Sequence, residues 1–294
     1  MAKFVKVILF LLLTVAFHSI AQGWPYFTEH LVLATPDNGV ATAIYAACKA
    51  TVKVGDGKEI TLHEETNYPF EEAIAFTVST GEKVAFPFYL RIPSWTKGAE
   101  VRVNGKKVSV TPVAGKYLCI NREWANGDRV ELTLPMSLSM RTWQVNKNSV
   151  SVDYGPLTLS LKIAEKYVEK DSRETAIGDS KWQKGADSKK WPTTEIYPDS
   201  PWNYSLVLDK REPLKNFKVI RKSWPADNYP FTATSVPLEV KAIGRPVPEW
   251  KIDETGLCGV LPEEDAVKGD KEEITLIPMG AARLRISAFP NTKE

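Results

Sequence analysis

The sequence predicts an all-β protein made of two tandem β-sandwich domains, preceded by a short helical segment. Three observations support this fold class. Runs of alternating apolar and polar residues recur along most of the chain, turn signals separate them every ~8 to 12 residues, and helical periodicity is nearly absent after residue 45. A composition with 43% hydrophobic and 10% aromatic residues supplies enough apolar surface for folded cores.

The first 21 residues have the pattern of a secretory signal peptide. Lys3 and Lys6 provide the positive start, and Val7–Phe17 is an apolar run of 11 residues. Ser19 and Ala21 are small residues at the two positions that signal peptidase reads, so we expect cleavage after residue 21. The run is shorter than the ~20 apolar residues of a membrane-spanning helix. We therefore expect export to the periplasm or the extracellular space, with no membrane contact after cleavage.

Residues 22–44 form a separate segment ahead of the strand-rich region. Within it, residues 26–34 (YFTEHLVLA) are the one stretch expected to form a short helix. Glu29 and His30 are adjacent in this stretch, but the HExxH order of a helical zinc site is absent. A structural role is therefore favoured for His30.

The first sandwich is expected to occupy residues 45–148. Its opening hairpin turns at Gly55-Asp56-Gly57, because an Asp-Gly pair between two alternating runs is a strong hairpin signal. A second hairpin is expected to turn at Asn104-Gly105 by the same reasoning. The strands of this domain are expected at residues 51–54, 59–63, 73–79, 86–92, 100–103, 107–110, 117–120 and 129–134.

The second sandwich is expected to occupy residues 149–294. A polar stretch at residues 165–190 indicates a long surface excursion, and prolines crowd residues 192–262, which predicts long ordered loops. A single elongated β-domain with one long insertion is the alternative for the chain as a whole. Strands of the second domain are expected at residues 150–152, 157–163, 204–208, 238–243, 274–278 and 283–288.

Charge and the counts of cysteine and histidine argue against several kinds of site. The formal charge of +2 falls to 0 without Lys3 and Lys6, so no basic face for nucleic acid is predicted. Only His30 and His63 follow the signal region, which leaves little for a His-based metal centre or a His-activated nucleophile. Three widely spaced cysteines without a CxxC pair favour free thiols over a disulfide or a metal site: Cys48, Cys119 and Cys258. No cofactor is expected.

Two pairs of adjacent glutamates are candidates for acid/base catalysis, Glu64-Glu65 and Glu71-Glu72. Glycosidases use two carboxyl groups about 5 to 9.5 Å apart. Neighbouring residues of a strand point to opposite faces, however, so structural roles in a strand or a turn are favoured for both pairs.

The nine tryptophans raise the possibility of carbohydrate binding, because sugars stack on aromatic rings. Trp95 and Trp124 occur in motifs at the ends of strands and are expected to pack between loop and sandwich. Trp202, in Ser200-Pro201-Trp202-Asn203-Tyr204, is the candidate substrate-binding residue.

Six motifs that are more specific than their turns and strands require occur in order along the chain. They are Glu64–Phe70, Leu90–Trp95 with Val103–Gly105, Asn121–Trp124 with Gly127-Asp128, Asp153–Leu157, Pro201–Tyr204, and Leu276–Gly280 with Arg283–Ile286. In this order they resemble the C-terminal part of glycoside hydrolase family 127, the β-L-arabinofuranosidase-like enzymes. The resemblance extends from about Gly23 to Pro290.

The resemblance implies a three-part enzyme in which an (α/α)6 barrel carries the active site and two β-sandwiches follow. The family's centre uses a zinc held by a glutamate and cysteines, a nucleophilic cysteine from a Cys-Cys pair, and a glutamate as acid/base. Residues 23–29 and 34–39 resemble the segment that closes the barrel, just after the expected nucleophile. No Cys-Cys pair is present and Cys48 follows that segment. No catalytic, cofactor or metal residue is therefore assigned.

The expected function is that of an exported, truncated β-sandwich fragment of a family 127-like glycoside hydrolase that is non-catalytic by itself. One alternative is an active hydrolase whose barrel is supplied by a separate chain. Another is a stand-alone carbohydrate-binding module for a plant cell-wall polysaccharide. Without a barrel, five apolar side chains are expected to form an exposed patch, and deleting residues 22–40 is expected to improve solubility: Trp24, Tyr26, Phe27, Leu31 and Leu33.

Overall fold

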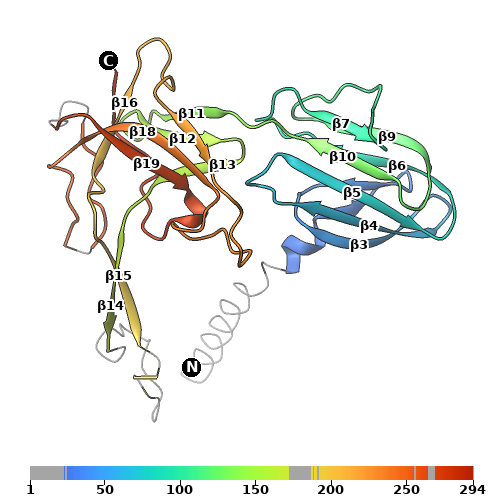
Figure 1. Cartoon of the computed structure of the whole chain (residues 1–294), viewed down its shortest axis with the longest axis horizontal. Helices are drawn as coiled ribbons and strands as arrows, with labels where there is room; N and C mark the ends of the chain where they lie inside the picture. The colour runs from blue at the N-terminus through green and yellow to red at the C-terminus, as the bar shows by residue number, and fades with distance from the viewer. Residues whose placement is uncertain are drawn as a thin grey trace, which may run out of the picture. The chain divides into compact units, whose positions relative to one another are not determined.

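The computed structural model is almost entirely β-strand and divides into two compact units, Met1–Ser137 and Leu138–Glu294 (Figure 1). It describes residues 23, 25–171, 187, 189–190, 192–254, 256–263 and 269–293. The all-β prediction is confirmed, whereas the signal-peptide prediction lies outside the described residues. No helix in the described part is long and apolar enough to cross a membrane.

The N-terminal segment is only partly helical. Residues 25–29 are helical, but β1 (Val32–Ala34) is a strand that pairs antiparallel with β2 (Val40–Thr42). The prediction of a helix over residues 26–34 is therefore wrong in its second half. Residues 32–34 form a strand because they pair with β2, which is itself held in the sheet by parallel pairing with the distant strand β6 (Val84–Arg91).

The same segment is partly built into the first unit. Leu31 is 6% exposed and Val40 is fully buried, whereas Tyr26 and Leu33 are 60% and 38% exposed. The expected exposed patch is thus wrong for Leu31, and Trp24 lies outside the described residues. Since deletion of residues 22–40 would remove β1 and the buried side chain of Val40, it is no longer expected to improve solubility.

The first unit is a sandwich of two sheets. One sheet has the order β1-β2-β6-β9 and the other has the order β3-β4-β5-β10-β7-β8. The remaining strands of this unit are β3 (Cys48–Val54), β4 (Lys58–Thr66), β5 (Ala73–Thr80), β7 (Glu100–Val103), β8 (Lys106–Lys107), β9 (Tyr117–Trp124) and β10 (Arg129–Thr133).

Alternation along β6 and β9 builds the centre of the first core. Phe86, Phe88 and Leu90 of β6 are buried, and the residues between them point outward. Trp124 is fully buried, stacks on Phe86 at 5.6 Å between ring centroids, and donates a hydrogen bond from Nε1 to the carbonyl of Phe86 at 2.9 Å. The packing role expected for Trp124 therefore fits its contacts.

The second unit begins earlier than the predicted boundary at residue 149. β11 (Leu138–Trp143) pairs antiparallel with β12 (Ser149–Tyr154), so it belongs with the second sheet. The other strands of this unit are β13 (Leu157–Leu161), β14 (Glu165–Lys170), β15 (Thr193–Pro198), β16 (Tyr204–Leu208), β17 (Lys218–Arg221), β18 (Leu238–Pro246), β19 (Glu272–Pro278) and β20 (Asn291–Lys293), and a short 3-10 helix, η2, spans Met279–Ala281.

One eight-stranded sheet encloses the core of the second unit. Its strand order is β11-β12-β13-β19-β18-β16-β20, and β17 pairs with β18. The C-terminal segment links two distant strands of this order, because Phe289 forms a bridge with Val150 of β12 and Pro290 accepts the amide of Leu206 of β16. The sheet therefore closes around the core, and residues 283–288 serve as irregular connection instead of the predicted strand.

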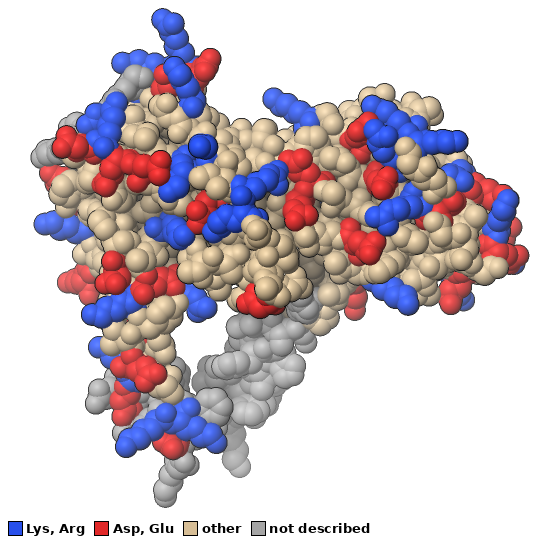
Figure 2. All heavy atoms as spheres, viewed as in Figure 1, with Lys and Arg blue, Asp and Glu red and all other residues tan. Residues whose placement is uncertain are grey.

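A separate two-stranded ribbon extends from this unit. β14 and β15 pair antiparallel and form a ribbon apart from the eight-stranded sheet (Figure 1). The predicted surface excursion at residues 165–190 thus starts as a strand, since residues 165–170 find partners at residues 193–198. On the face shown in Figure 2, cationic and anionic side chains are interspersed over both units.

Candidate functional site

Trp202, the sugar-binding candidate, is partly buried in the second unit. Its ring lies edge-on to Trp250, with 5.2 Å between centroids and 65° between ring planes, and it packs against the core. The Nε1 of Trp250 donates to the carbonyl of Gly259 at 3.0 Å, which anchors the pair. Part of the Trp202 ring is thus committed to packing, and sugar binding by this residue stays a prediction.

Glu64 and Glu65 have different environments, as expected for neighbours on a strand. Glu64 is 1% exposed and accepts hydrogen bonds from the amide of Ala46 at 3.0 Å and the thiol of Cys48 at 3.8 Å. Burial raises the pKa of Glu64 to about 8. Glu65 pairs with Arg129 at 3.3 Å on the exposed face. The two carboxyl groups therefore do not form a catalytic pair.

The second glutamate pair lies in the bend between β4 and β5, where Glu72 accepts the amide of Met136 at 3.0 Å. This contact ties the bend to the segment after β10. Because it satisfies a backbone donor, the carboxylate of Glu72 has a structural role.

The three cysteines are free thiols in the structure. Burial, followed by the charge of Glu64, raises the pKa of Cys48 to about 11, so its thiolate is scarce at neutral pH. Within the described ranges, no three His, Cys, Asp or Glu side chains gather where they could hold a metal ion.

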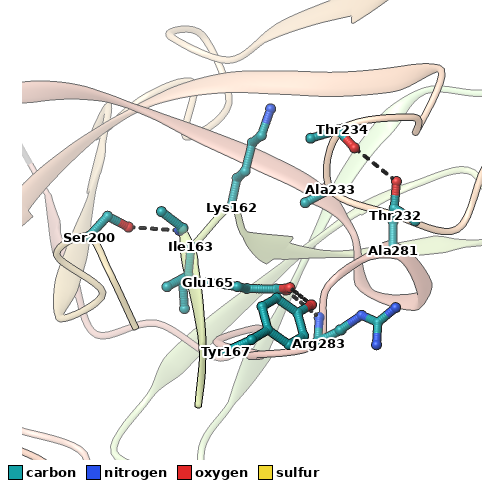
Figure 3. Close-up of a pocket in the computed structure, with 11 residues that line it drawn as sticks. Lys162, Ile163, Glu165, Tyr167, Ser200, Thr232, Ala233, Thr234, Ala281 and Arg283 are labelled. Carbon is teal, nitrogen blue, oxygen red and sulfur yellow. Dashed lines mark hydrogen bonds between the residues drawn. The ribbon is translucent and has the colours of Figure 1, made fainter. Parts of the chain in front are cut away.

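A groove of about 610 Å³ in the second unit is a candidate site (Figure 3). It lies where β13 leads into β14 and is lined by three further segments, at Ser200, at residues 232–234, and at residues 281–283. Its volume falls within the ~300–1,000 Å³ typical of ligand sites.

Glu165, the first residue of β14, organises one end of this groove. Its Oε2 accepts the hydroxyl of Tyr167 at 2.5 Å, and its Oε1 accepts the main-chain amide of Arg283 at 3.3 Å (Figure 3). The Arg283 guanidinium lies 5.9 Å from the centroid of the Tyr167 ring. The hydrogen bond to Glu165 raises the pKa of the Tyr167 hydroxyl. One carboxylate therefore positions an exposed aromatic ring and a cationic residue together.

Hydroxyl groups and a lysine line other parts of the groove. Thr232 and Thr234 are linked through their hydroxyls at 3.1 Å, and Ser200 accepts the amide of Ala164 at 2.9 Å (Figure 3). Lys162 bonds to Glu239 at 2.7 Å. The groove thus combines an aromatic face, hydroxyls and charged groups, which is the chemistry of a polar-ligand site.

No residue singled out from the sequence as a binding candidate lines this groove. Arg283 and Arg285 fall in the segment 283–288 that was expected to be a strand, yet Arg285 donates from Nε to the carbonyl of Ala282 at 2.8 Å and Arg283 lines the groove. The available signal was the order Glu-x-Tyr at residues 165–167, which places both side chains on one face of a strand.

One family model matches most of the first unit. Residues 39–136 match the family model described as Beta-L-arabinofuranosidase, GH127 middle domain. This range contains β2 to β10 and therefore most of the first sandwich. No curated protein matches the sequence.

Solved structures resemble the chain over nearly its whole length. One is a GH127 β-L-arabinofuranosidase from Geobacillus stearothermophilus T6, with a TM-score of 0.58 and 22% identity over 90% of this chain and 35% of that one. A second GH127 β-arabinofuranosidase has a TM-score of 0.56 and 23% identity over 88% of this chain and 36% of that one. A third, described as a glycoside hydrolase, has a TM-score of 0.54 and 22% identity over 87% and 36%.

These likenesses establish the fold, and the chain spans about a third of the length of those solved proteins. The part of the chain that the structure describes consists of β-sheet domains without a helical barrel. The resemblance stated from the sequence motifs is thereby confirmed: the chain is similar in fold to part of GH127 β-L-arabinofuranosidases, and its residues 39–136 match the model of the GH127 middle domain.

Proposed function

We propose that this chain is an exported β-sheet portion of a family 127-type glycoside hydrolase. It is non-catalytic by itself and works alongside enzymes that degrade carbohydrates. The observation that carries the proposal is the match of residues 39–136 to a middle domain. The whole chain spans about a third of the length of the solved relatives. The relatives' names connect that fold with β-L-arabinofuranosides.

The local chemistry of the described residues supports the non-catalytic part of the proposal. Glu64 is buried against the backbone amide of Ala46, and Glu72 accepts the amide of Met136. Cys48 has a raised pKa, which disfavours the thiolate that a cysteine nucleophile needs.

The direct test is hydrolysis by the purified full chain. We expect no turnover of an aryl β-L-arabinofuranoside above the buffer rate, with or without added zinc, and no stoichiometric zinc by elemental analysis. Reproducible hydrolysis that co-elutes with the protein would overturn the non-catalytic proposal. Glu64→Gln is the matched variant, because it would abolish such activity only if this buried carboxyl took part.

Export is tested by the N-terminus of the secreted protein. The Lys3 to Ala21 pattern supports it, so we expect material recovered from the periplasm or the medium to begin at Gln22. Recovery of only the intact chain, from the cytoplasm, would contradict export.

A second candidate function is that of an accessory chain for a separately encoded catalytic barrel. The exposed side chains of Tyr26 (60%) and Leu33 (38%) favour it, because exposed apolar side chains are suited to an interface. Co-expression with a family 127 barrel domain tests it. Co-elution that is lost in Tyr26→Ser/Leu33→Ser would support this candidate, and separate elution of the two proteins would count against it.

A further inference from the structure

We propose that the groove at Glu165, Tyr167 and Arg283 binds an acidic oligosaccharide, with Arg283 holding a sugar carboxylate and Tyr167 packing against a sugar ring. This inference names a ligand class within the proposed function. It rests on that function only for the expectation that the ligand is a carbohydrate. The Trp202 site expected from the sequence is a different place in the same unit.

The groove is built entirely within the second unit. Its lining residues belong to four chain segments that converge around the start of β14. Its volume of about 610 Å³ exceeds what a single bound ion needs and suits a ligand the size of a short oligosaccharide. The groove thus suits an extended ligand.

The charged residues that line the groove are Lys162, Glu165 and Arg283. Lys162 is paired with Glu239, whose Oε1 it contacts at 2.7 Å. The carboxylate of Glu165 bonds to the main chain of Arg283. No carboxylate among the described residues forms an ion pair with the Arg283 guanidinium. The Arg283 guanidinium is therefore available to pair with an anionic ligand.

The cationic group of the groove is a guanidinium. A guanidinium presents a planar set of donors that matches a carboxylate in a bidentate manner, and Arg283 lies on the exposed surface beside the ring of Tyr167. A sugar carboxylate bound there would place its own ring near the Tyr167 side chain. This pairing of a guanidinium with an aromatic ring selects a uronic acid over a neutral sugar.

The Tyr167 side chain is held in place before a ligand binds. Tyr167 is 50% exposed, yet its hydroxyl is held by Glu165 at 2.5 Å, so its ring is available while its orientation is restricted. Restricting a binding side chain before the ligand arrives reduces the entropy lost on association. The hydroxyls of Thr232 and Thr234 provide partners for sugar hydroxyls elsewhere in the groove (Figure 3).

The ribbon itself supplies a matched control. Tyr197 on β15 is 44% exposed and its hydroxyl bonds to Glu195, which repeats the Glu-x-Tyr arrangement of Glu165 and Tyr167. Tyr197 pairs in register with Lys166, so it lies on the face of the ribbon opposite to Tyr167. Tyr197→Ala therefore removes an equivalent exposed aromatic residue outside the groove.

The experiment is calorimetric titration of the purified full chain with oligogalacturonate and with a neutral arabino-oligosaccharide of similar length. We expect binding of oligogalacturonate only. Arg283→Ala should weaken it about tenfold or more, the loss typical of a charge-assisted hydrogen bond. Arg283→Lys should retain part of the affinity, Tyr167→Ala should weaken binding, and Tyr197→Ala should leave it within about twofold of the parent protein, as expected for a surface change outside the site.

Any of three results would overturn the inference. The first is absence of oligogalacturonate binding by the parent chain, and the second is unchanged affinity in both Arg283→Ala and Arg283→Lys, with folding verified by circular dichroism. The third, equal binding of the neutral oligosaccharide, would overturn the assignment of an acidic ligand. None of these results would bear on hydrolysis, so failure here remains distinguishable from failure of the proposed function.

Discussion

Glu64 makes the stability of the first unit dependent on pH in a direction opposite to that of most carboxylates. Its side chain is 1% exposed, and burial raises its pKa from an ordinary 4.5 to about 8. The folded state therefore holds the proton more tightly than the unfolded state. As pH rises from about 4.5 to about 8, the unfolded chain ionises first, and the free energy of unfolding falls. Above about pH 8 both states are ionised and the effect is constant.

The size of the effect follows from the pKa change. At about 1.4 kcal/mol for each tenfold change in proton affinity, the change corresponds to at most about 5 kcal/mol. Glu64→Gln replaces the carboxyl with a neutral group that can still accept the amide of Ala46. The variant should therefore match the parent protein near pH 5 and exceed its stability by several kcal/mol, up to about 5, near pH 8.5.

Urea unfolding at pH 5 and at pH 8.5 measures this difference. Pulsed hydrogen exchange with mass spectrometry of residues 73–80 reports on the first unit, because β5 lies in the centre of its six-stranded sheet. Glu65→Gln is the control, since Glu65 lies on the exposed face and should leave the pH dependence almost unchanged. An identical loss of stability with rising pH in the parent protein and in Glu64→Gln would refute the reasoning.

Three further predictions concern stability. Trp124→Phe removes the side-chain hydrogen bond to the carbonyl of Phe86 and reduces buried volume. The free energy of unfolding in urea should therefore fall by about 2–3 kcal/mol. A fall below about 0.5 kcal/mol would contradict the packing described. Deleting residues 22–40 removes a paired strand, so the soluble yield should fall, and an increased yield would restore the expectation from sequence. Asp153→Asn weakens a bidentate contact with Arg141 (2.6 and 2.9 Å) and should cost about 1–2 kcal/mol by thermal melting, whereas an unchanged melting temperature would show the pair to be dispensable.

Local turn chemistry explains why the fold class could be predicted. The hairpin turn at residues 55–57 contains two glycines with positive φ, 53° for Gly55 and 83° for Gly57. The turn at Asn104 and Gly105 likewise has positive φ at both residues, 50° and 76°. Asn and Gly tolerate this backbone conformation, so the sequence alone locates the hairpins and the strands that flank them.

Pairing between distant segments explains most of what the sequence did not reveal. Residues 32–34 become a strand through β2, and residues 138–143 join the second unit because their partners lie at 149–154. The groove is the strongest case, since Glu165 and Arg283 are 118 positions apart in sequence and meet only in the fold. No local pattern encodes such a meeting, so the candidate site required the structure.

The rate of glycoside hydrolysis by the purified full chain is the decisive measurement for a non-catalytic role. We expect an aryl β-L-arabinofuranoside to be hydrolysed no faster than in buffer, at neutral pH and with zinc supplied in excess. Saturable hydrolysis that follows the protein through successive purification steps would contradict the claim that the β-sheet units serve a non-catalytic role.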